Sequence, residues 1–421
     1  MHARAKEQEV SGARRSAFAR TSLASQTARR RPGRAILALA RIVCLALALL
    51  LCGCASGGAR EGTPDVEVTE HLSLEAATQY DVAFREDGTY LLTIGETDRY
   101  LLVPDDIEPA DGGDLTRIAL PLHDTYLAAS SAMDFFVRLD ALDAVRMTST
   151  KRSDWSLEEV SSAIEDESML YVGKYSAPDY ERVLSEGAQV AIESTMIYHS
   201  PEVAERLTAL GIPVLVERSS YETSPLGRLE WIKLYGLLTG RLDEAERIFD
   251  EQVAAVEHVS SKDLSTRPNV AFFSISANGH AVVRKPGDYV SQMIDLAGGR
   301  YFLEAKDTPT DTANALSTMN MEMESFYEAA RDADIIIYNS AIDDELRSID
   351  DLVAKSPRLA DFKAVRNDRV WCTGKDLFQQ PTCVADMVQE MSAAFAEKDA
   401  DGGADRTNFE HLYRVRWKDG Q

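Results

Sequence analysis

Five cysteines are the residues in this chain whose positions most limit the chemistry that it can do. Cys44, Cys52 and Cys54 lie close together near the N-terminus, whereas Cys372 and Cys383 lie near the other end. The distal pair is predicted either to form a disulfide or to remain two separate thiols, because the sequence gives no distance between them. No cysteine–histidine spacing is typical of a zinc site, so we predict no metal ligand and no bound cofactor.

The chain lacks the common catalytic signatures. It contains no G-x-S-x-G, no glycine-rich phosphate loop and no H-E-x-x-H, which are the motifs of hydrolases, nucleotide enzymes and metalloproteases. We therefore expect a binding protein and not an enzyme. A hydrolase acting in a cleft stays open as an alternative, and an assay with generic esters would test it.

The first 53 residues have the pattern of a secretory signal. Basic residues dominate positions 1–34, and an apolar run follows at 35–51, interrupted by Arg41. This order is typical of a signal peptide, and the run is too broken for a transmembrane helix. Leu51-Cys52-Gly53-Cys54 resembles the bacterial lipobox, so Cys54 is predicted to carry a lipid, followed by a flexible tether at 54–64.

Removal of this leader makes the remaining chain more acidic. Residues 1–53 hold ten basic and two acidic residues, so their loss takes the formal net charge from −24 to −32. A surface this acidic repels nucleic acid. We therefore predict an extracytoplasmic, lipid-anchored monomer that binds no nucleic acid.

Hydrophobic periodicity predicts two α/β lobes after a β-rich N-terminal extension. The first lobe with its extension covers 65–224, the connecting helix 225–260, the second lobe 261–400 and a loose polar tail 401–421. Ile118–Leu122 is interpreted as the first strand of the first lobe. If the helix runs on past Gly240, it spans about 50 Å and forms a strut between the lobes.

Several short segments carry a family pattern. They are Glu181-Arg182-Val183-Leu184 before Val190-Ala191-Ile192, Leu210-Gly211-Ile212-Pro213-Val214, Pro225-Leu226-Gly227-Arg228, Leu296-Ala297-Gly298-Gly299, and Met323-Glu324-Ser325-Phe326-Tyr327 before Asp334-Ile335-Ile336-Ile337. Their order resembles the class III periplasmic-binding-protein family, the cobalamin, ferric-siderophore and haem receptors of ABC importers. Ala188-Gln189 stands where Pro-Asp is usual. The resemblance covers roughly residues 115–397 and does not include the β-rich extension.

The resemblance implies a ligand cleft between the lobes, bordered by the loops that follow the strands. Aromatic and cationic side chains on these loops suit a bulky anionic chelate. The predicted ligand-binding residues are His123, Tyr126, Lys151, Arg152, Trp155, Lys174, Tyr175, Thr195, Met196, Tyr221, Arg284, Tyr289 and Lys375.

The resemblance also implies one glutamate per lobe that meets arginines of the permease. Glu181 and Glu324 occupy matching places, each in a helix just before a strand, and Glu322 competes with Glu324. The expected function is therefore capture of an iron chelate (a siderophore) or a corrinoid for an ABC importer. The alternatives are a haem or bare-metal receptor of the same fold, or a surface lipoprotein with no role in transport.

Overall fold

The computed structural model describes residues 66–109, 113–260, 267–304, 318–341, 345–397 and 409–418, which all belong to one compact unit, Gly62–Gln421. The predicted signal peptide, the tether and Cys54 lie outside the described residues. No helix in the described ranges is long and apolar enough to cross a membrane.

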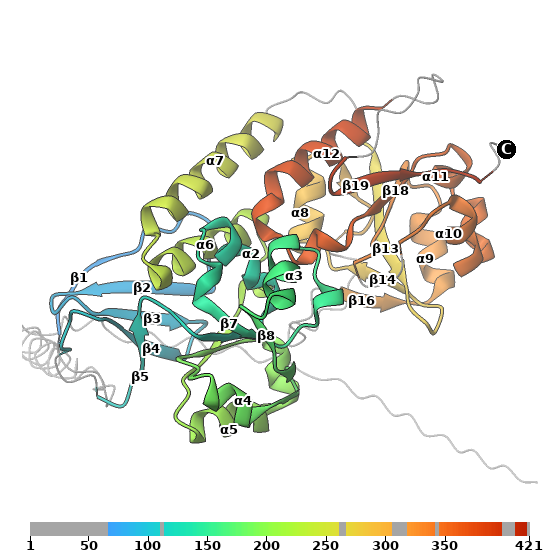
Figure 1. Ribbon diagram of the computed structural model, residues 1–421. Helices are drawn as coiled ribbons and strands as arrows, with labels where there is room; N and C mark the ends of the chain where they lie inside the picture. Colours follow the sequence, from blue (N-terminus) through green and yellow to red (C-terminus); the bar gives the residue numbers. More distant parts are fainter. Residues whose placement is uncertain are drawn as a thin grey trace, which may run out of the picture. The chain divides into compact units, whose positions relative to one another are not determined.

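The β-rich extension is a five-stranded sheet, drawn in blue in Figure 1. Its strands are β1 (Val68–His71), β2 (Tyr80–Arg85), β3 (Tyr90–Ile94), β4 (Asp98–Pro104) and β5 (Thr116–Leu120), paired in that order. The first three pairs are antiparallel, but β4 and β5 run parallel. The prediction that Ile118–Leu122 opens the first lobe was therefore wrong, because local alternation marks a strand without showing which sheet it joins.

Two buried glutamates attach the extension to the rest of the unit. The Glu230 carboxylate accepts hydrogen bonds from the backbone N–H groups of residues 75–77 at 2.8–3.1 Å and from Lys233 Nζ at 2.7 Å. Glu222 accepts hydrogen bonds from the N–H groups of Thr78 and Gln79 and from the Trp231 indole. Both side chains are almost fully buried, so these charge-assisted bonds are shielded from water.

Lobe 1 begins after this sheet and has a parallel sheet in the order β12-β11-β6-β7-β8. Helices α2 and α3 cover one face of this sheet, and α4 and α5 cover the other (Figure 1). The elements are β6 (Thr125–Leu127), α2 (Met133–Arg138), β7 (Val145–Thr148), α3 (Glu158–Glu165), β8 (Leu170–Tyr171), β9 (Gly173–Lys174), β10 (Ala177–Pro178), α4 (Tyr180–Ser185), β11 (Ala191–Ser194), α5 (Pro201–Ala209) and β12 (Val214–Glu217).

The connecting segment is a pair of helices, α6 (Pro225–Thr239) and α7 (Leu242–Ser260), and not one continuous strut. The Ser224 side chain caps α6 as its position predicts. Gly240 ends α6 in the left-handed region, with φ 71°, a conformation that glycine adopts without strain. A Cβ at Gly236 would lie 2.5 Å from the Ala245 side chain, so α6 and α7 pack closely because this position is glycine.

Lobe 2 contains a mixed sheet in the order β16-β14-β13-β17-β18-β19, with β15 (Arg300–Tyr301) paired to β13. The strands β13, β17 and β18 are parallel to one another. The remaining elements are β13 (Asn269–Ile275), β14 (Ala281–Arg284), α8 (Tyr289–Leu296), β16 (Thr318–Met321), α9 (Met323–Ala330), β17 (Ile335–Tyr338), α10 (Ile349–Lys355), α11 (Lys363–Arg366), β18 (Val370–Thr373), α12 (Val384–Ala396) and β19 (Leu412–Val415).

The two lobes share one strand order, and the C-terminal segment completes the second. The parallel run β6-β11-β12 has the same order as β13-β17-β18, so β11 and β17 occupy equivalent places, although β14 is antiparallel to β13 and β7 is parallel to β6. The last strand, β19, pairs antiparallel with β18. The expected loose tail is therefore wrong for residues 409–418, because Leu412 and Val415 are buried and Phe409 stacks on Trp371.

The open question about the two C-terminal cysteines is resolved in favour of separate thiols. Cys372 is buried in β18, Cys383 is half-buried, and both are free.

Candidate ligand-binding site

Two cations lie beside a concavity on lobe 1, where the chain leaves strand β7. Lys151 and Arg152 belong to the loop that continues into a short 3-10 helix, η3 (Arg152–Asp154). Together with Ser153 and Ser161 they line an open concavity of about 530 Å³ at the surface of the lobe. Arg152 pairs with the exposed Glu165 at 2.5 Å, and such an exposed pair contributes little stability. Its guanidinium can therefore exchange this partner for an anionic ligand.

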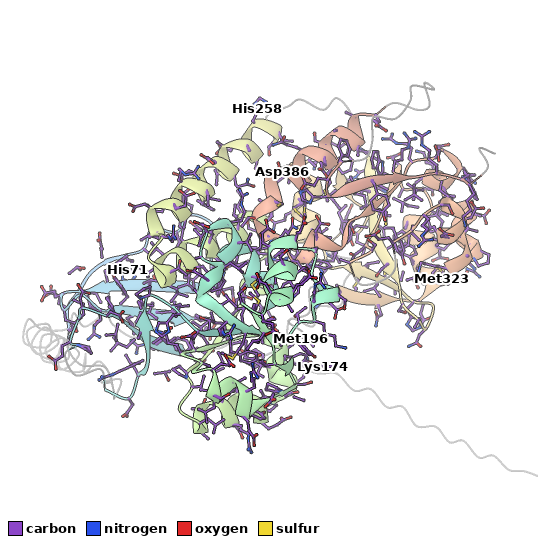
Figure 2. All side chains as sticks on the ribbon, viewed as in Figure 1. His71, Lys174, Met196, His258, Met323 and Asp386 are labelled. Atoms are coloured by element: carbon purple, nitrogen blue, oxygen red, sulfur yellow. The ribbon has the colours of Figure 1, made fainter. Side chains whose placement is uncertain are left out.

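The same edge of lobe 1 exposes large apolar side chains. Tyr171 ends β8, while Met196 and Tyr198 lie in η4 (Thr195–His199), directly after β11. They are 37%, 46% and 50% exposed, and only Val68 and Leu184 join them among the large hydrophobic residues that are exposed in the described ranges. Lys174, which is labelled with Met196 in Figure 2, is exposed in the hairpin that follows β8. We call this set the cationic edge: Lys151, Arg152, Tyr171, Lys174, Met196 and Tyr198.

The lobes contact each other next to this edge. Gln379 Oε1 of lobe 2 accepts hydrogen bonds from the Ser156 N–H and hydroxyl, both at 2.8 Å, and Gln379 Nε2 donates to the Asp154 carbonyl. Thr382 donates two further bonds to Asp134. These bonds form a polar seam between lobe 1, at α2 and the loop after β7, and the segment of lobe 2 after β18.

Asp134 is the titratable group at the centre of this seam. It is only 2% exposed. Burial raises the pKa of Asp134 to about 6, although the hydrogen bonds from Thr382 act in the opposite direction. The seam therefore contains a carboxyl group that gains or loses its proton in mildly acidic solution.

Two buried arginines pack against one tyrosine ring next to the seam. The Arg228 guanidinium lies 4.6 Å from the Tyr289 ring centroid and donates to the Phe378 carbonyl at 3.0 Å. Arg284 lies 4.8 Å from the same ring and forms a two-bond ion pair with Asp288. The adjoining pocket, of about 10 Å³, is the size of one water molecule. In this structure the Arg284 residue is 5% exposed and its guanidinium is already paired with Asp288, so its observed contacts are structural.

Two predicted residues lie away from the loops for which they were proposed. His123 precedes β6 and sits at the amino end of the sheet, with its ring 3.1 Å from Asp124. Tyr126 is inside β6 and fully buried. Both errors arise because residues 118–122 were interpreted as the first strand of lobe 1. The first strand of this lobe is β6 (Thr125–Leu127), so the segment after its carboxyl end is 128–132. The prediction that His123 and Tyr126 occupy a cleft loop was wrong.

The remaining predicted residues follow strands of lobe 1 or begin elements of lobe 2. Trp155 is 8% exposed and donates from its indole to the Thr150 carbonyl, so it supports the Lys151 loop. Tyr175 is half-buried in the hairpin turn, and Thr195 opens η4. Lys375 opens η8 (Lys375–Phe378), but its side chain lies outside the described residues.

Tyr221 lies beside the N-terminal extension. It follows β12 in η5 (Ser219–Tyr221), with the Arg218 guanidinium 5.0 Å from its ring centroid. The next residue, Glu222, is the buried anchor for Thr78 and Gln79. The extension therefore covers the loop after β12, which the sequence did not indicate.

The two predicted docking glutamates occupy equivalent positions. Glu181 is the second residue of α4, which precedes β11, and Glu324 is the second residue of α9, which precedes β17. Both side chains are exposed. Glu324 pairs with Arg358, whereas Glu181 has no salt bridge to any described residue. Their burial and helix positions match, but their charge environments differ.

Sequence comparison finds relatives that are themselves uncharacterized. Over 230 residues the chain is 24% identical to an uncharacterized lipoprotein of Methanocaldococcus jannaschii, covering 54% of this chain and 53% of that protein. A second lipoprotein of the same organism is 26% identical over 182 residues, covering 42% of this chain and 44% of that protein. The chain spans about half the length of the curated relatives it matches.

Solved structures share the fold at low sequence identity. A periplasmic binding protein from Veillonella parvula matches with a TM-score of 0.55 and 16% identity, covering 74% of this chain and 99% of that chain. The periplasmic haem-binding protein HutB of Vibrio cholerae matches at 0.53 and 16%, covering 65% and 98%. A petrobactin-binding protein from Bacillus subtilis matches at 0.52 and 14%, covering 66% and 94%.

The family model described as "Periplasmic binding protein" matches residues 133–377, which is more than half of the chain. This range runs from α2 in lobe 1 to η8 in lobe 2 and includes the connecting helices. The N-terminal sheet lies outside it. With its two α/β lobes and their common strand order, this chain belongs to the periplasmic binding protein family.

Proposed function

We propose that this protein is an extracytoplasmic solute-binding lipoprotein that captures a bulky anionic metal chelate and delivers it to an ABC importer. The feature that carries the proposal is the cationic edge of lobe 1, a set of exposed cations and exposed apolar side chains on the segments that follow β7, β8 and β11. The favoured cargo is a ferric siderophore or a corrinoid.

The cations at this edge contrast with the negative net charge of the whole chain. A formal net charge of −24 repels anions at long range. Cations grouped beside a concavity of about 530 Å³ provide a local exception to that repulsion. Charge-assisted hydrogen bonds from lysine and arginine can pair with the carboxylates or oxyanions of a chelate. The exposed ring of Tyr171 can pack against its organic part.

The family relationship supports the same class of cargo. Structural neighbours include proteins described as haem-binding and petrobactin-binding. Haem is the rival ligand, because the exposed phenol of Tyr198 is of a type that ligates haem iron in some proteins. A coloured protein with a haem absorbance band after purification would favour that rival.

The proposal also includes a lipid anchor and docking on the permease of the importer. Cys54 would carry the lipid, and the naming of two sequence relatives as lipoproteins is consistent with this. Glu181 and Glu324 would meet arginines of the permease, since they occupy equivalent first-turn positions on the two lobes. Charge pairs at an interface rim steer and orient partners more than they add affinity.

Thermal shift with a panel of ferric siderophores, cobalamins and haem tests the cargo. We expect one chelate class to raise the melting temperature, because a ligand that binds only the folded state stabilises it by mass action. Calorimetry then gives the dissociation constant of the active compound. If no member of the panel shifts the transition while the protein is folded and free of bound ligand, the chelate proposal fails.

A further inference from the structure

Three metal-ligating side chains meet in lobe 2, away from the cationic edge. They are Cys383 at the end of η9 (Pro381–Cys383), Asp386 in the first turn of α12, and His411 just before β19. One ligand atom from each lies within 4.8 Å of the other two. Figure 2 labels Asp386 on α12. Cys383 is the N-cap residue of α12, and Asp386 lies three positions on, in the first turn of that helix.

The histidine in this cluster is held in place by a second carboxylate. Asp376 Oδ2 contacts His411 Nδ1. The His411 residue is 4% exposed. Glu390 accepts hydrogen bonds from the backbone N–H groups of Glu410 and His411 at 2.9 and 3.0 Å, which fixes the entry into β19. A carboxylate on one ring nitrogen is the usual arrangement behind a histidine that binds metal through the other nitrogen.

We propose that Cys383, Asp386 and His411 form a site for a zinc ion, with His411 Nε2, the Cys383 thiolate and an Asp386 oxygen as ligands. Asp376 is the positioning residue that orients the His411 ring. A sulfur, a nitrogen and an oxygen ligand suit zinc, whereas calcium and magnesium prefer oxygen alone. Zinc takes four ligands in a tetrahedron, so water or a fourth group completes the site.

The three side chains need to move only slightly to bind a zinc ion. Zinc–ligand bonds of about 2.0–2.3 Å place neighbouring ligand atoms about 3.5 Å apart. The observed separations are within 4.8 Å. Asp386 is exposed, so its side chain can move to the ion by changing rotamer. The Cys383 thiol now donates to Gln380 Oε1 at 3.4 Å, and this weak bond is lost when the thiolate binds metal.

The position of the site gives it a structural role. It connects β19 to the start of α12 and, through Asp376, to η8. The segment between η8 and α12 carries Gln379 and Thr382, which make the seam with lobe 1. Zinc would therefore hold the C-terminal strand and the seam segment together, independently of the cargo that binds at the cationic edge.

The test measures zinc binding to reduced, metal-free protein by competition with a chromophoric chelator, and repeats it with cobalt as a spectroscopic probe. We expect one tightly bound zinc per chain, a tetrahedral cobalt spectrum with a thiolate charge-transfer band, and a higher melting temperature with zinc. Cys383→Ser should remove the charge-transfer band and weaken zinc binding by at least about 100-fold. Asp386→Asn should weaken binding but keep the band.

Asp376→Asn separates positioning from direct ligation. It should weaken zinc binding by about 10–100-fold and leave the thiolate band in place at saturating cobalt. Asp106→Asn in the turn after β4 and His123→Ala before β6 are matched controls, because both side chains are exposed and neither belongs to lobe 2. These controls should bind zinc as the unaltered protein does. The proposal is overturned if the folded protein binds no zinc stoichiometrically, or if binding survives Cys383→Ser and Asp386→Asn unchanged.

Discussion

Asp134 of lobe 1 accepts two hydrogen bonds from Thr382 of lobe 2, at 2.9 Å from the backbone nitrogen and 2.7 Å from the hydroxyl. These residues are 248 positions apart in the sequence. Asp134 is buried, and no positive charge is hydrogen-bonded to its carboxylate in the described structure. The lobes therefore meet at this point through one buried carboxyl group that accepts both bonds.

The first prediction concerns pH. Burial raises the pKa of Asp134 from 3.8 to about 6. Between these values the folded protein holds this proton more tightly than the unfolded chain, so the contribution of Asp134 to stability falls as pH rises from about 4 to about 6 and then levels. The loss is about 2–3 kcal/mol at roughly 1.4 kcal/mol per pKa unit. Asp134→Asn keeps an acceptor for Thr382 and removes this loss.

Urea unfolding from pH 4 to pH 8 measures the effect. The Asp134→Asn variant should match the unaltered protein near pH 4 and exceed it in stability at pH 7. Asp250→Asn, an exposed replacement on α7, should follow the unaltered protein throughout. Parallel stability curves for all three proteins would show that Asp134 is not the group responsible.

The second prediction concerns the N-terminal extension. Glu230 binds three backbone N–H groups of residues 75–77 and the Lys233 ammonium, and its side chain is fully buried. Glu230→Gln should cost about 3–5 kcal/mol of unfolding free energy, because it leaves Lys233 buried without its anion. Limited proteolysis should then cut the variant first near residues 72–79. Glu159→Gln on the exposed face of α3 serves as the control, and a cost below about 1 kcal/mol for Glu230→Gln would contradict the anchoring role.

The third prediction concerns docking. Glu181→Arg combined with Glu324→Arg should leave ligand affinity unchanged but abolish uptake and binding to the permease, because like charges at a contact repel. Arg358→Ala, which frees Glu324 from its partner, should not reduce uptake. Glu159→Arg combined with Glu328→Arg places the same charges on other exposed helix positions. Normal uptake by the Glu181/Glu324 reversal, with expression and ligand binding intact, would remove these residues from the mechanism.

Much of the fold could be predicted from local periodicity. The helix α9 at Met323–Ala330 begins at the first residue of the Met323 family segment, and the strand β17 at Ile335–Tyr338 contains its Ile335-Ile336-Ile337 run. The membership of β5 in the N-terminal sheet could not be predicted, because alternation of buried and exposed residues looks the same in any sheet. The break at Gly240 was visible only as one glycine, and the packing of Gly236 against Ala245 depends on tertiary structure.

Only those residues of the candidate site that lie directly after a strand could be predicted from the sequence. Lys151, Arg152, Lys174 and Met196 lie on loops after parallel strands, where such loops share an edge. Arg228 was missed because it lies inside a helix. The Gln379–Ser156 contact joins residues 223 positions apart, and only docking of the lobes creates it. The Cys383, Asp386 and His411 cluster was also missed, although Cys383-x-x-Asp386 at a helix start is a weak local signal.

The central claim is that the cationic edge binds an anionic chelate, and calorimetry of one variant tests it most directly. Lys151→Glu combined with Arg152→Glu should weaken affinity for the chelate identified in the panel by at least about 100-fold, because two charge-assisted contacts of about 1.5–3 kcal/mol each become repulsive. Arg300→Glu combined with Arg366→Glu changes two exposed cations of lobe 2 by the same charge and should leave affinity within about twofold. Equal affinities for the two double variants, both folded, would contradict the assignment of the ligand site to this edge.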